Sequence, residues 1–170
     1  RLTLAFHRHG VRKVRLTGGE PLVRREVEKL VALLARLPDL DLTMTTNGLL
    51  LPQKAAGLKA AGLQRITVSL DSLDEAVFQA MNDVGARVAG VLRGIEAAEQ
   101  AGLRPIKINM VVKRGVNESS VLPMVRYFRE RGHILRFIEF MDVGHTNGWR
   151  LDDVVPAREL VATIDAEFPL

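Results

Sequence analysis

Apolar and polar positions along the chain follow two periods, which together predict a regular succession of strands and helices. Five stretches have the residue-by-residue alternation or short apolar runs of strands, at 11–17, 41–47, 65–71, 105–112 and 135–141. Between them apolar residues recur every three to four positions, which is typical of amphipathic helices. The clearest predicted helices span 22–37 and 86–101, and others span 120–131 and begin near 157. Strands that alternate with helices predict βαβ units and a parallel sheet.

Glycines mark the ends of four helical stretches, at Gly10, Gly62, Gly102 and Gly132. An extended run follows each of them closely, and glycine just past a helix is the usual left-handed cap. Residues 72 and 75 are Ser and Glu, a capping-box spacing that predicts a short helix before 86–101. Residues 1–9 are interpreted as the tail of a helix and 161–168 as a helix in progress. The sequence is therefore interpreted as one domain over residues 1–170, cut at both ends.

Four successive predicted strands have one polar and one apolar face. Strands of an open parallel sheet are covered on both sides and are apolar throughout. A polar face on four strands instead favours a parallel β/α barrel or part-barrel, with helices outside and a polar interior that holds a ligand. An antiparallel sheet wetted on one side is the alternative, and the intervening helices disfavour it. The polar positions are Lys13, Arg15, Thr17, Asp41, Thr43, Thr45, Asn47, Arg65, Thr67, Ser69, Asp71, Lys107 and Asn109.

Composition and charge argue against several classes of function. The net charge is +4 with both signs mixed, which does not favour a nucleic-acid partner. No apolar run is long enough to cross a membrane, so a cytoplasmic protein without a membrane partner is expected. The chain has no cysteine, which excludes disulfides, thiolate zinc sites and cysteine-held iron–sulfur clusters within these residues. The four histidines are scattered, so no metal site is expected here.

The ends of the predicted strands carry the candidate chemistry, because β/α barrels place their sites there. The first strand ends in Gly18-Gly19-Glu20-Pro21. Two glycines let the backbone approach a ligand, and Pro21 suits the first turn of the following helix, whose N-terminus favours anions. Glu20 could hold an ammonium group.

Basic side chains near these strand ends favour a polyanionic ligand such as a phosphate ester. Lys13, Arg15 and Lys107 are on the polar face. Arg136 and Glu139 are three residues apart on the last strand, so they lie on opposite faces whose orientation the sequence leaves open. The alternative role of these cations is ion pairing inside the barrel with Glu20, Asp41, Asp71 and Glu139.

Several of these segments resemble a known family. Residues 15–22 are similar to the Gly-Gly-Glu-Pro motif of the radical S-adenosylmethionine superfamily, and residues 45–48, 68–71 and 107–112 lie where its next strands are expected. Residues 136–144, followed by Asn147-Gly148-Trp149, are a narrower match. Together they resemble the molybdenum cofactor biosynthesis protein A family, the GTP 3′,8-cyclases. The resemblance implies an α/β fold, a partial parallel barrel with about five of its strands present.

The resemblance also implies a reaction and its site. In that family a [4Fe-4S] cluster reductively splits S-adenosylmethionine, and the resulting radical takes hydrogen from the ribose C3′ of GTP, which then bonds to guanine C8. The cyclic product feeds molybdopterin synthesis, and an electron donor is an implied partner; the oligomeric state is not fixed, and a homodimer is compatible. The matching positions would bind S-adenosylmethionine through Gly18, Gly19, Glu20, Ser69 and Met141. GTP would be contacted by Arg15, Thr45 and Lys107, with Lys13 and Arg136 assisting at its phosphates.

The sequence departs from this family by lacking three of its features. The family has a three-cysteine group before the first strand, a second after the barrel and a C-terminal arginine segment, none of which is present. We interpret this as truncation, and we expect the fragment alone to be inactive. The alternatives are another radical S-adenosylmethionine enzyme of the peptide-modifying type, a ligand-binding relic without clusters, and a phosphate-binding metabolic barrel.

Overall fold

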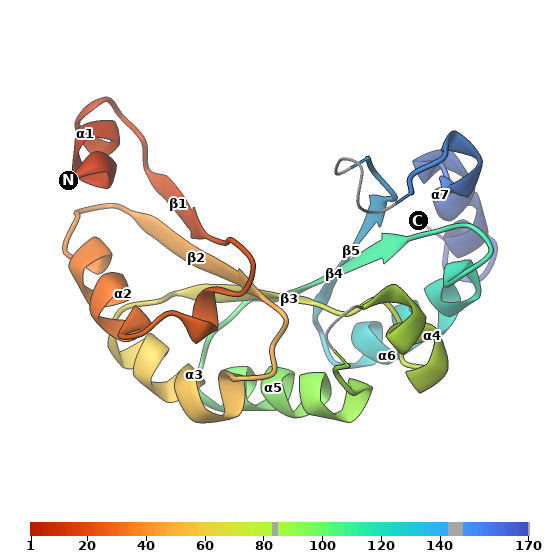
Figure 1. Cartoon of the computed structure of the whole chain (residues 1–170), viewed down its shortest axis with the longest axis horizontal. Helices are drawn as coiled ribbons and strands as arrows, with labels where there is room; N and C mark the ends of the chain where they lie inside the picture. The colour runs from red at the N-terminus through yellow and green to blue at the C-terminus, as the bar shows by residue number, and fades with distance from the viewer. Residues whose placement is uncertain (83–84, 143–147, 170) are drawn as a thin grey trace. The chain divides into compact units, whose positions relative to one another are not determined.

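The computed structural model describes residues 1–82, 85–142 and 148–169 (Figure 1). The chain divides into two compact units, one of Arg1–Ser69 with Ala89–Ile106 and one of Leu70–Val88 with Lys107–Leu170. Strands and helices alternate along the chain as predicted. The elements are α1 (Leu2–Arg8), β1 (Lys13–Leu16), the 3-10 helix η1 (Pro21–Val23), α2 (Val27–Ala35), β2 (Asp41–Thr46), α3 (Leu51–Ala60), β3 (Arg65–Ser69), α4 (Glu75–Met81), α5 (Val88–Gln100), β4 (Ile106–Val112), η2 (Glu118–Ser120), α6 (Val121–Glu130), β5 (Ile134–Glu139), η3 (Leu151–Asp153) and α7 (Ala157–Asp165).

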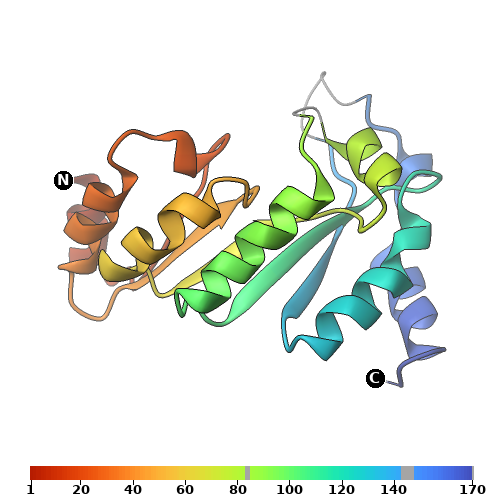
Figure 2. The same cartoon turned by 90° about the horizontal axis from the view of Figure 1, so that it is seen from below.

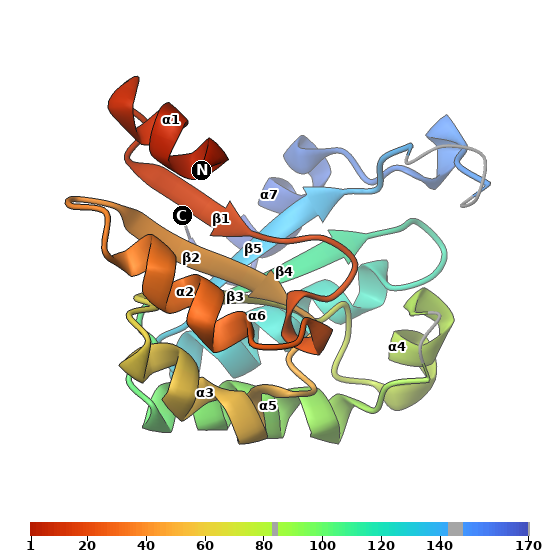
Figure 3. The same cartoon turned by 60° about the vertical axis from the view of Figure 1, so that its left-hand side comes forward.

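In the first unit β1, β2 and β3 form a parallel sheet whose two faces differ as the sequence predicts. The apolar face is buried, with Leu42, Met44, Ile66 and Val68 each 1% exposed or less. Figure 3 shows α2, α3 and α5 along this face. On the other face the register places polar residues in rows across the strands, because Thr43 pairs with both Arg15 and Arg65, and Thr45 pairs with Thr67.

Helix α5 approaches the turn after β2 closely. A Cβ atom added to Gly94 would lie 2.1 Å from the carbonyl oxygen of Gly48. Gly48 itself has a positive φ of 82°, and a Cβ there would meet the Val68 side chain at 2.9 Å. Such short separations leave no room for a side chain at either position. The two glycines therefore fix the turn that follows Thr46 and Asn47 at the carboxyl end of β2.

In the second unit β4 and β5 are parallel neighbours, with α6 and α7 packed beside β5 (Figure 2). Burial alternates along β4, so Ile108 and Met110 are fully buried while Lys107 and Asn109 are half-buried. Phe128 of α6 and Leu160 of α7 add to the apolar core of this unit. Each unit thus has the strand-and-helix layering expected of an α/β chain.

The helix ends agree with the sequence at the glycines and differ elsewhere. Gly10, Gly62, Gly102 and Gly132 all have positive φ, as a left-handed cap requires. The continuous helix predicted over 22–37 is wrong. The chain forms η1, then Glu26 adopts a left-handed φ of 54°, and α2 begins only at Val27.

The predicted capping box is also wrong in its details. Asp74, not Ser72, caps α4, because its side chain accepts a hydrogen bond from the Val77 amide at 2.9 Å. Ser72 is fully buried and accepts a hydrogen bond from the Asp74 amide. Glu75 reaches out of its own helix and accepts from the amide of Val88 at 3.1 Å. Ser72 therefore orients the residue that caps α4, and Glu75 links α4 to the first residue of α5.

Candidate functional site

Glu20 joins the turn after β1 to the end of β2. Its Oε1 accepts hydrogen bonds from the Leu22 amide at 2.9 Å and from the Thr46 hydroxyl at 2.7 Å. Its Oε2 accepts from the Asn47 amide at 2.7 Å. The carboxylate, which sequence analysis assigns to a ligand ammonium group, therefore also caps η1 and aligns two strand ends. A carboxylate has about four acceptor positions, so Glu20 retains acceptor capacity on Oε2.

The backbone at Gly18 and Gly19 is open. Gly18 has a φ of 146°, and a Cβ added at either glycine would meet no atom within 4 Å. Both residues are exposed. Peptide groups in this position are accessible to a ligand, as the predicted close approach of the backbone requires.

Thr45 has a buried hydroxyl without a partner. Its Oγ1 forms no hydrogen bond within the part of the chain that the structure describes. A buried hydroxyl that is left unsatisfied costs about 1–3 kcal/mol, and such groups are uncommon in folded proteins. Thr45 faces the polar side of the sheet in register with Thr67, and Ser69 follows two residues later on that side at the end of β3. The Thr45 hydroxyl therefore has an unused hydrogen-bonding capacity on the polar face of the sheet.

The basic residues of the first unit divide between ion pairs and open surface. Arg65 forms a two-pronged pair with Asp41, with Nε at 3.0 Å from Oδ1, and the Lys13 Nζ lies 4.0 Å from Asp41 Oδ2. Lys13 therefore lies at ion-pair distance from Asp41, one of the partners of the ion-pair alternative, and Arg65, which is not among the predicted ligand cations, pairs with the same carboxylate. Arg15 is exposed on the same face, beside Thr43 and one row closer to the carboxyl end than Lys13. It is available to an anionic ligand.

In the second unit β4 and β5 orient the remaining predicted cations. Arg136 donates from Nε at 3.1 Å and from Nη2 at 2.6 Å to Oδ1 of Asn109, its partner in the strand register. Arg136 therefore shares a face with Asn109 and Lys107, which answers the orientation that the sequence leaves open. Glu139 turns to the other side, where Oε1 accepts from the Ala157 amide at 2.6 Å and caps α7.

A buried network at the carboxyl end of β4 was missed by sequence reasoning. Asn117 is fully buried and donates from Nδ2 to the carbonyls of Asp71 at 2.9 Å and Val111 at 2.7 Å, while Oδ1 accepts from the Lys113 amide at 2.8 Å. The Asp71 carboxylate accepts from the Val111 amide at 2.8 Å. Burial raises the pKa of the Asp71 carboxyl to about 6, and the Val111 hydrogen bond offsets part of that rise. Nothing in the local sequence pattern marks Asn117.

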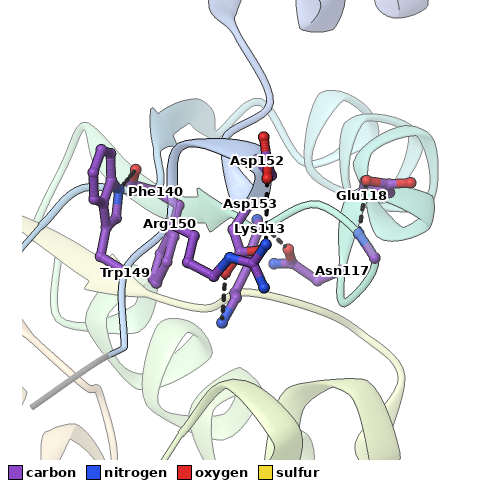
Figure 4. Close-up of polar contacts among 9 residues, drawn as sticks. Lys113, Asn117, Glu118, Phe140, Trp149, Arg150, Asp152 and Asp153 are labelled. Carbon is purple, nitrogen blue, oxygen red and sulfur yellow. Dashed lines mark hydrogen bonds and ion pairs between the residues drawn. The ribbon is translucent and has the colours of Figure 1, made fainter.

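Met141 lies two residues beyond the end of β5 and is 54% exposed. The carbonyl of the preceding residue, Phe140, accepts a hydrogen bond from the side chain of Trp149, which belongs to a later segment (Figure 4). Val143, Gly144 and Asn147, which belong to the motif that sequence analysis singles out, lie outside the described residues. Ser69, Gly18, Gly19, Glu20, Thr45, Lys13 and Arg15 thus belong to the first unit, and Lys107, Arg136 and Met141 to the second.

The described residues contain neither a cluster of metal-ligating side chains nor a membrane-spanning helix. Across 1–82, 85–142 and 148–169, no group of three or more His, Cys, Asp or Glu side chains is arranged to hold a metal ion. Over the same ranges, no helix combines the length and apolar character needed to cross a bilayer.

Comparison with protein families and curated sequences gives consistent matches. Residues 1–128 match the model of the Radical SAM superfamily. A GTP 3′,8-cyclase of Acidothermus cellulolyticus is 53% identical across 100% of this chain and 47% of its own length. The corresponding protein of Xanthomonas axonopodis pv. citri is 55% identical, with 99% of this chain and 51% of its own length covered. The chain spans about half the length of these curated relatives.

Solved structures share the fold at low sequence identity. Methylornithine synthase (PylB) has a TM-score of 0.72 at 17% identity and covers 94% of this chain and 49% of its own. Coproporphyrinogen III oxidase (HemN) from Escherichia coli has a TM-score of 0.63 at 13% identity. The match covers 92% of this chain and 39% of the oxidase. The structure of anSMEcpe with bound AdoMet has a TM-score of 0.63 at 19% identity. The match covers 86% of this chain and 40% of anSMEcpe. These likenesses confirm the predicted fold class, an α/β chain of the partial parallel barrel type with five parallel strands among the described residues.

Proposed function

Because this chain belongs to the radical SAM superfamily, we propose that it forms the S-adenosylmethionine- and GTP-binding core of a GTP 3′,8-cyclase that serves molybdenum cofactor biosynthesis. The identity of 53–55% to proteins of that name, which extends along essentially the whole chain, supports this assignment. The chain covers about half of those relatives. The complete reaction is therefore proposed for a polypeptide that also supplies the cysteine ligands of the cluster, which these residues lack.

The proposed contacts with S-adenosylmethionine are Gly18, Gly19, Glu20, Ser69 and Met141. The open peptide groups of Gly18 and Gly19 suit a backbone contact with the methionine end. Glu20 is held by three hydrogen bonds from η1 and β2, so its remaining acceptor position is fixed in direction. A carboxylate that is already oriented loses little entropy when it binds an ammonium group.

The proposed contacts with GTP are Lys13, Arg15, Thr45, Lys107 and Arg136. The observation that carries this part is the buried, unpartnered hydroxyl of Thr45. It lies on the polar face of the sheet that also bears the exposed Arg15, so a polar anionic ligand could satisfy both. Guanidinium groups bind phosphates through two parallel hydrogen bonds, which suits Arg15 and Arg136 to the triphosphate.

The residues present do not fit an iron–sulfur cluster. The chain has no cysteine, and cluster ligation depends on cysteine thiolates. The superfamily uses S-adenosylmethionine with a [4Fe-4S] cluster, which supplies the electron for reductive cleavage, so the ligands must come from outside these residues. We therefore predict that the 170 residues alone bind ligands without turning over. An electron donor as partner and a cytoplasmic location complete the proposal.

Substitution of Arg15 in the complete polypeptide, purified anaerobically with its cluster, tests the proposal. With C3′-deuterated GTP, the protein should transfer deuterium to 5′-deoxyadenosine and form a product that carries the C3′–C8 bond, both read by mass spectrometry. Arg15→Gln should weaken GTP binding about tenfold or more, because a charge-assisted hydrogen bond contributes roughly 1.5–3 kcal/mol. Arg25→Gln, an exposed arginine just before α2, is the matched control and should leave GTP binding unchanged.

The outcomes separate the alternatives. Cleavage of S-adenosylmethionine without GTP turnover would contradict the cyclase assignment and favour another radical S-adenosylmethionine enzyme, such as a peptide-modifying one. Failure to bind either ligand would leave a relic or a different phosphate-binding barrel as the better description.

A further inference from the structure

Phe140 is fixed from two sides just after β5 ends at Glu139. Its carbonyl oxygen accepts a hydrogen bond of 3.0 Å from Nε1 of Trp149. Its ring is covered by the ammonium group of Lys113, with Nζ 4.6 Å from the ring centre. Figure 4 shows Trp149 and Lys113 approaching Phe140 from different elements. Phe140 lies beyond the strand ladder, so these side chains restrain a residue that the sheet itself does not hold.

The partners of Phe140 are themselves anchored to β4. Lys113 Nζ lies 3.5 Å from Asp153 Oδ2, and the backbone of Lys113 bridges that of Val154 in antiparallel sense. The next amide, of Arg114, donates to the Asp153 carbonyl at 2.8 Å. We call residues 149–155 the strap. It crosses from Phe140, at the exit of β5, to Lys113, at the exit of β4.

We propose that Trp149 is a positioning residue that sets the backbone of Phe140, and through it Met141, for contact with S-adenosylmethionine. This inference rests on the proposed function, which makes Met141 a ligand contact. The strap supplies the physical reason. Met141 directly follows Phe140 beyond the end of the strand, so the backbone of Phe140 sets where the backbone of Met141 begins. The strap ties Phe140 to the end of β4, so the backbone that leads into Met141 is held before the ligand arrives.

Trp149 acts on Phe140 through a single hydrogen bond. The indole of Trp149 donates through a single N–H group, and its only polar atom is used on the Phe140 carbonyl. Phenylalanine at this position keeps most of the apolar ring and removes that donor. Trp149→Phe therefore separates positioning from packing, which truncation to alanine would not.

The test compares Trp149→Phe with Arg150→Gln in the complete, cluster-loaded polypeptide. Arg150 belongs to the same strap, is exposed and pairs with the exposed Asp152 at 3.4 Å, so its replacement controls for altering the strap. Three quantities are measured: the KM for S-adenosylmethionine in reductive cleavage, kcat at saturation, and the Kd for GTP. A fourth is the amide hydrogen exchange of a peptide that covers residues 138–142.

For Trp149→Phe we expect the KM for S-adenosylmethionine to rise about threefold to tenfold, the range of one lost hydrogen bond. The Kd for GTP and the saturated kcat should stay within about twofold, and exchange in residues 138–142 should accelerate. Lys113→Met, which keeps a long unbranched side chain but removes the ammonium group that lies over the Phe140 ring and pairs with Asp153, should move the same KM in the same direction. Arg150→Gln should change none of these quantities.

Two results would overturn the inference while the proposed function stands. One is an unchanged KM for S-adenosylmethionine in a folded Trp149→Phe variant. The other is an equal loss of affinity for both ligands together with a lower unfolding midpoint, which would mean general destabilisation. If the unsubstituted protein does not bind S-adenosylmethionine, the proposed function fails first, and the inference fails with it.

Discussion

The hydroxyl of Thr46 donates a hydrogen bond of 2.7 Å to the carboxylate of Glu20. The hydroxyl oxygen of its neighbour Thr45 is buried and has no hydrogen-bond partner among the residues that the structure describes. The two threonines are adjacent on β2 and therefore face opposite sides of the sheet. One hydroxyl contributes to the fold, and the other belongs to the proposed GTP contact.

This contrast predicts opposite phenotypes for two substitutions of the same kind. Thr46→Val removes the bond to Glu20 and the acceptor of the Gly48 amide, and should lower the free energy of unfolding by about 1–3 kcal/mol. Thr45→Val removes only an unsatisfied hydroxyl, so the free energy of unfolding should stay the same or increase. Denaturant unfolding of the two variants measures this difference.

GTP affinity should instead depend more on Thr45 than on Thr46. Thr45→Val should weaken GTP binding about threefold to tenfold in a titration, because it removes one hydrogen bond to the ligand. A destabilised Thr45→Val protein with unchanged GTP affinity would mean that the hydroxyl has a structural partner and no ligand role.

The buried carboxyl of Asp71 predicts a pH dependence of stability. Its pKa is about 6 in the folded protein against 3.8 for the free side chain, so between these values the folded state binds more protons than the unfolded state. Stability contributed by this group therefore falls as the pH rises through this window, by up to about 3 kcal/mol.

Asp71→Asn should remove that dependence, because the amide carries no charge and its oxygen can still accept from the Val111 amide. The variant should match the unsubstituted protein near pH 4 and exceed its stability near pH 7.5. Urea unfolding at the two pH values measures the difference. An equal offset at both values would show that the carboxyl titrates normally.

The approach of α5 to the turn after β2 predicts that Gly94→Ala is strongly destabilising. The added Cβ would lie 2.1 Å from the Gly48 carbonyl oxygen, so the helix must move, at a cost of about 1–3 kcal/mol or more. Gly57 in α3 provides the control, because a Cβ there meets only a Glu28 side-chain carbon at 3.5 Å. Gly57→Ala should stabilise the helix by about 0.5–1 kcal/mol. Thermal unfolding that ranks the variants the other way would contradict the close approach.

The capping of α7 by Glu139 gives a fourth prediction. Glu139→Ala leaves the Ala157 amide without its acceptor and should lower the free energy of unfolding by about 1 kcal/mol. Glu139→Gln keeps an acceptor oxygen and should recover most of that loss. If both variants unfold at the midpoint of the unsubstituted protein, the cap does not contribute to stability.

The strands and helix ends were predictable from the sequence where the spacing of apolar residues and glycines directly reflects the backbone. The alternation along β4 and the four capping glycines gave the strands and helix ends directly. The break at Glu26 was hidden, because Val23 and Val27 keep helical spacing across it. Val23 is 69% exposed as a result, although the pattern places it on the buried stripe.

The site was predictable only in part, because its geometry depends on contacts between distant segments. The orientation of Arg136 follows from the register with Asn109, 27 residues earlier, which no periodicity in β5 reveals. Asn117 and the strap have irregular backbones that are fixed by tertiary hydrogen bonds. The periodicity of a single sequence does not reveal such contacts, even where a residue such as Arg136 or Trp149 stands out by resemblance to a family.

The opposite orientations of Arg136 and Glu139 make β5 sensitive to misalignment. A shift of β5 by one residue against β4 would exchange its two faces. Arg136 would lose Asn109 and enter the helix side, and α7 would lose its N-terminal acceptor in the same event. A misregistered chain thus loses hydrogen bonds on both faces of β5 at once, so the native register is favoured over the shifted one.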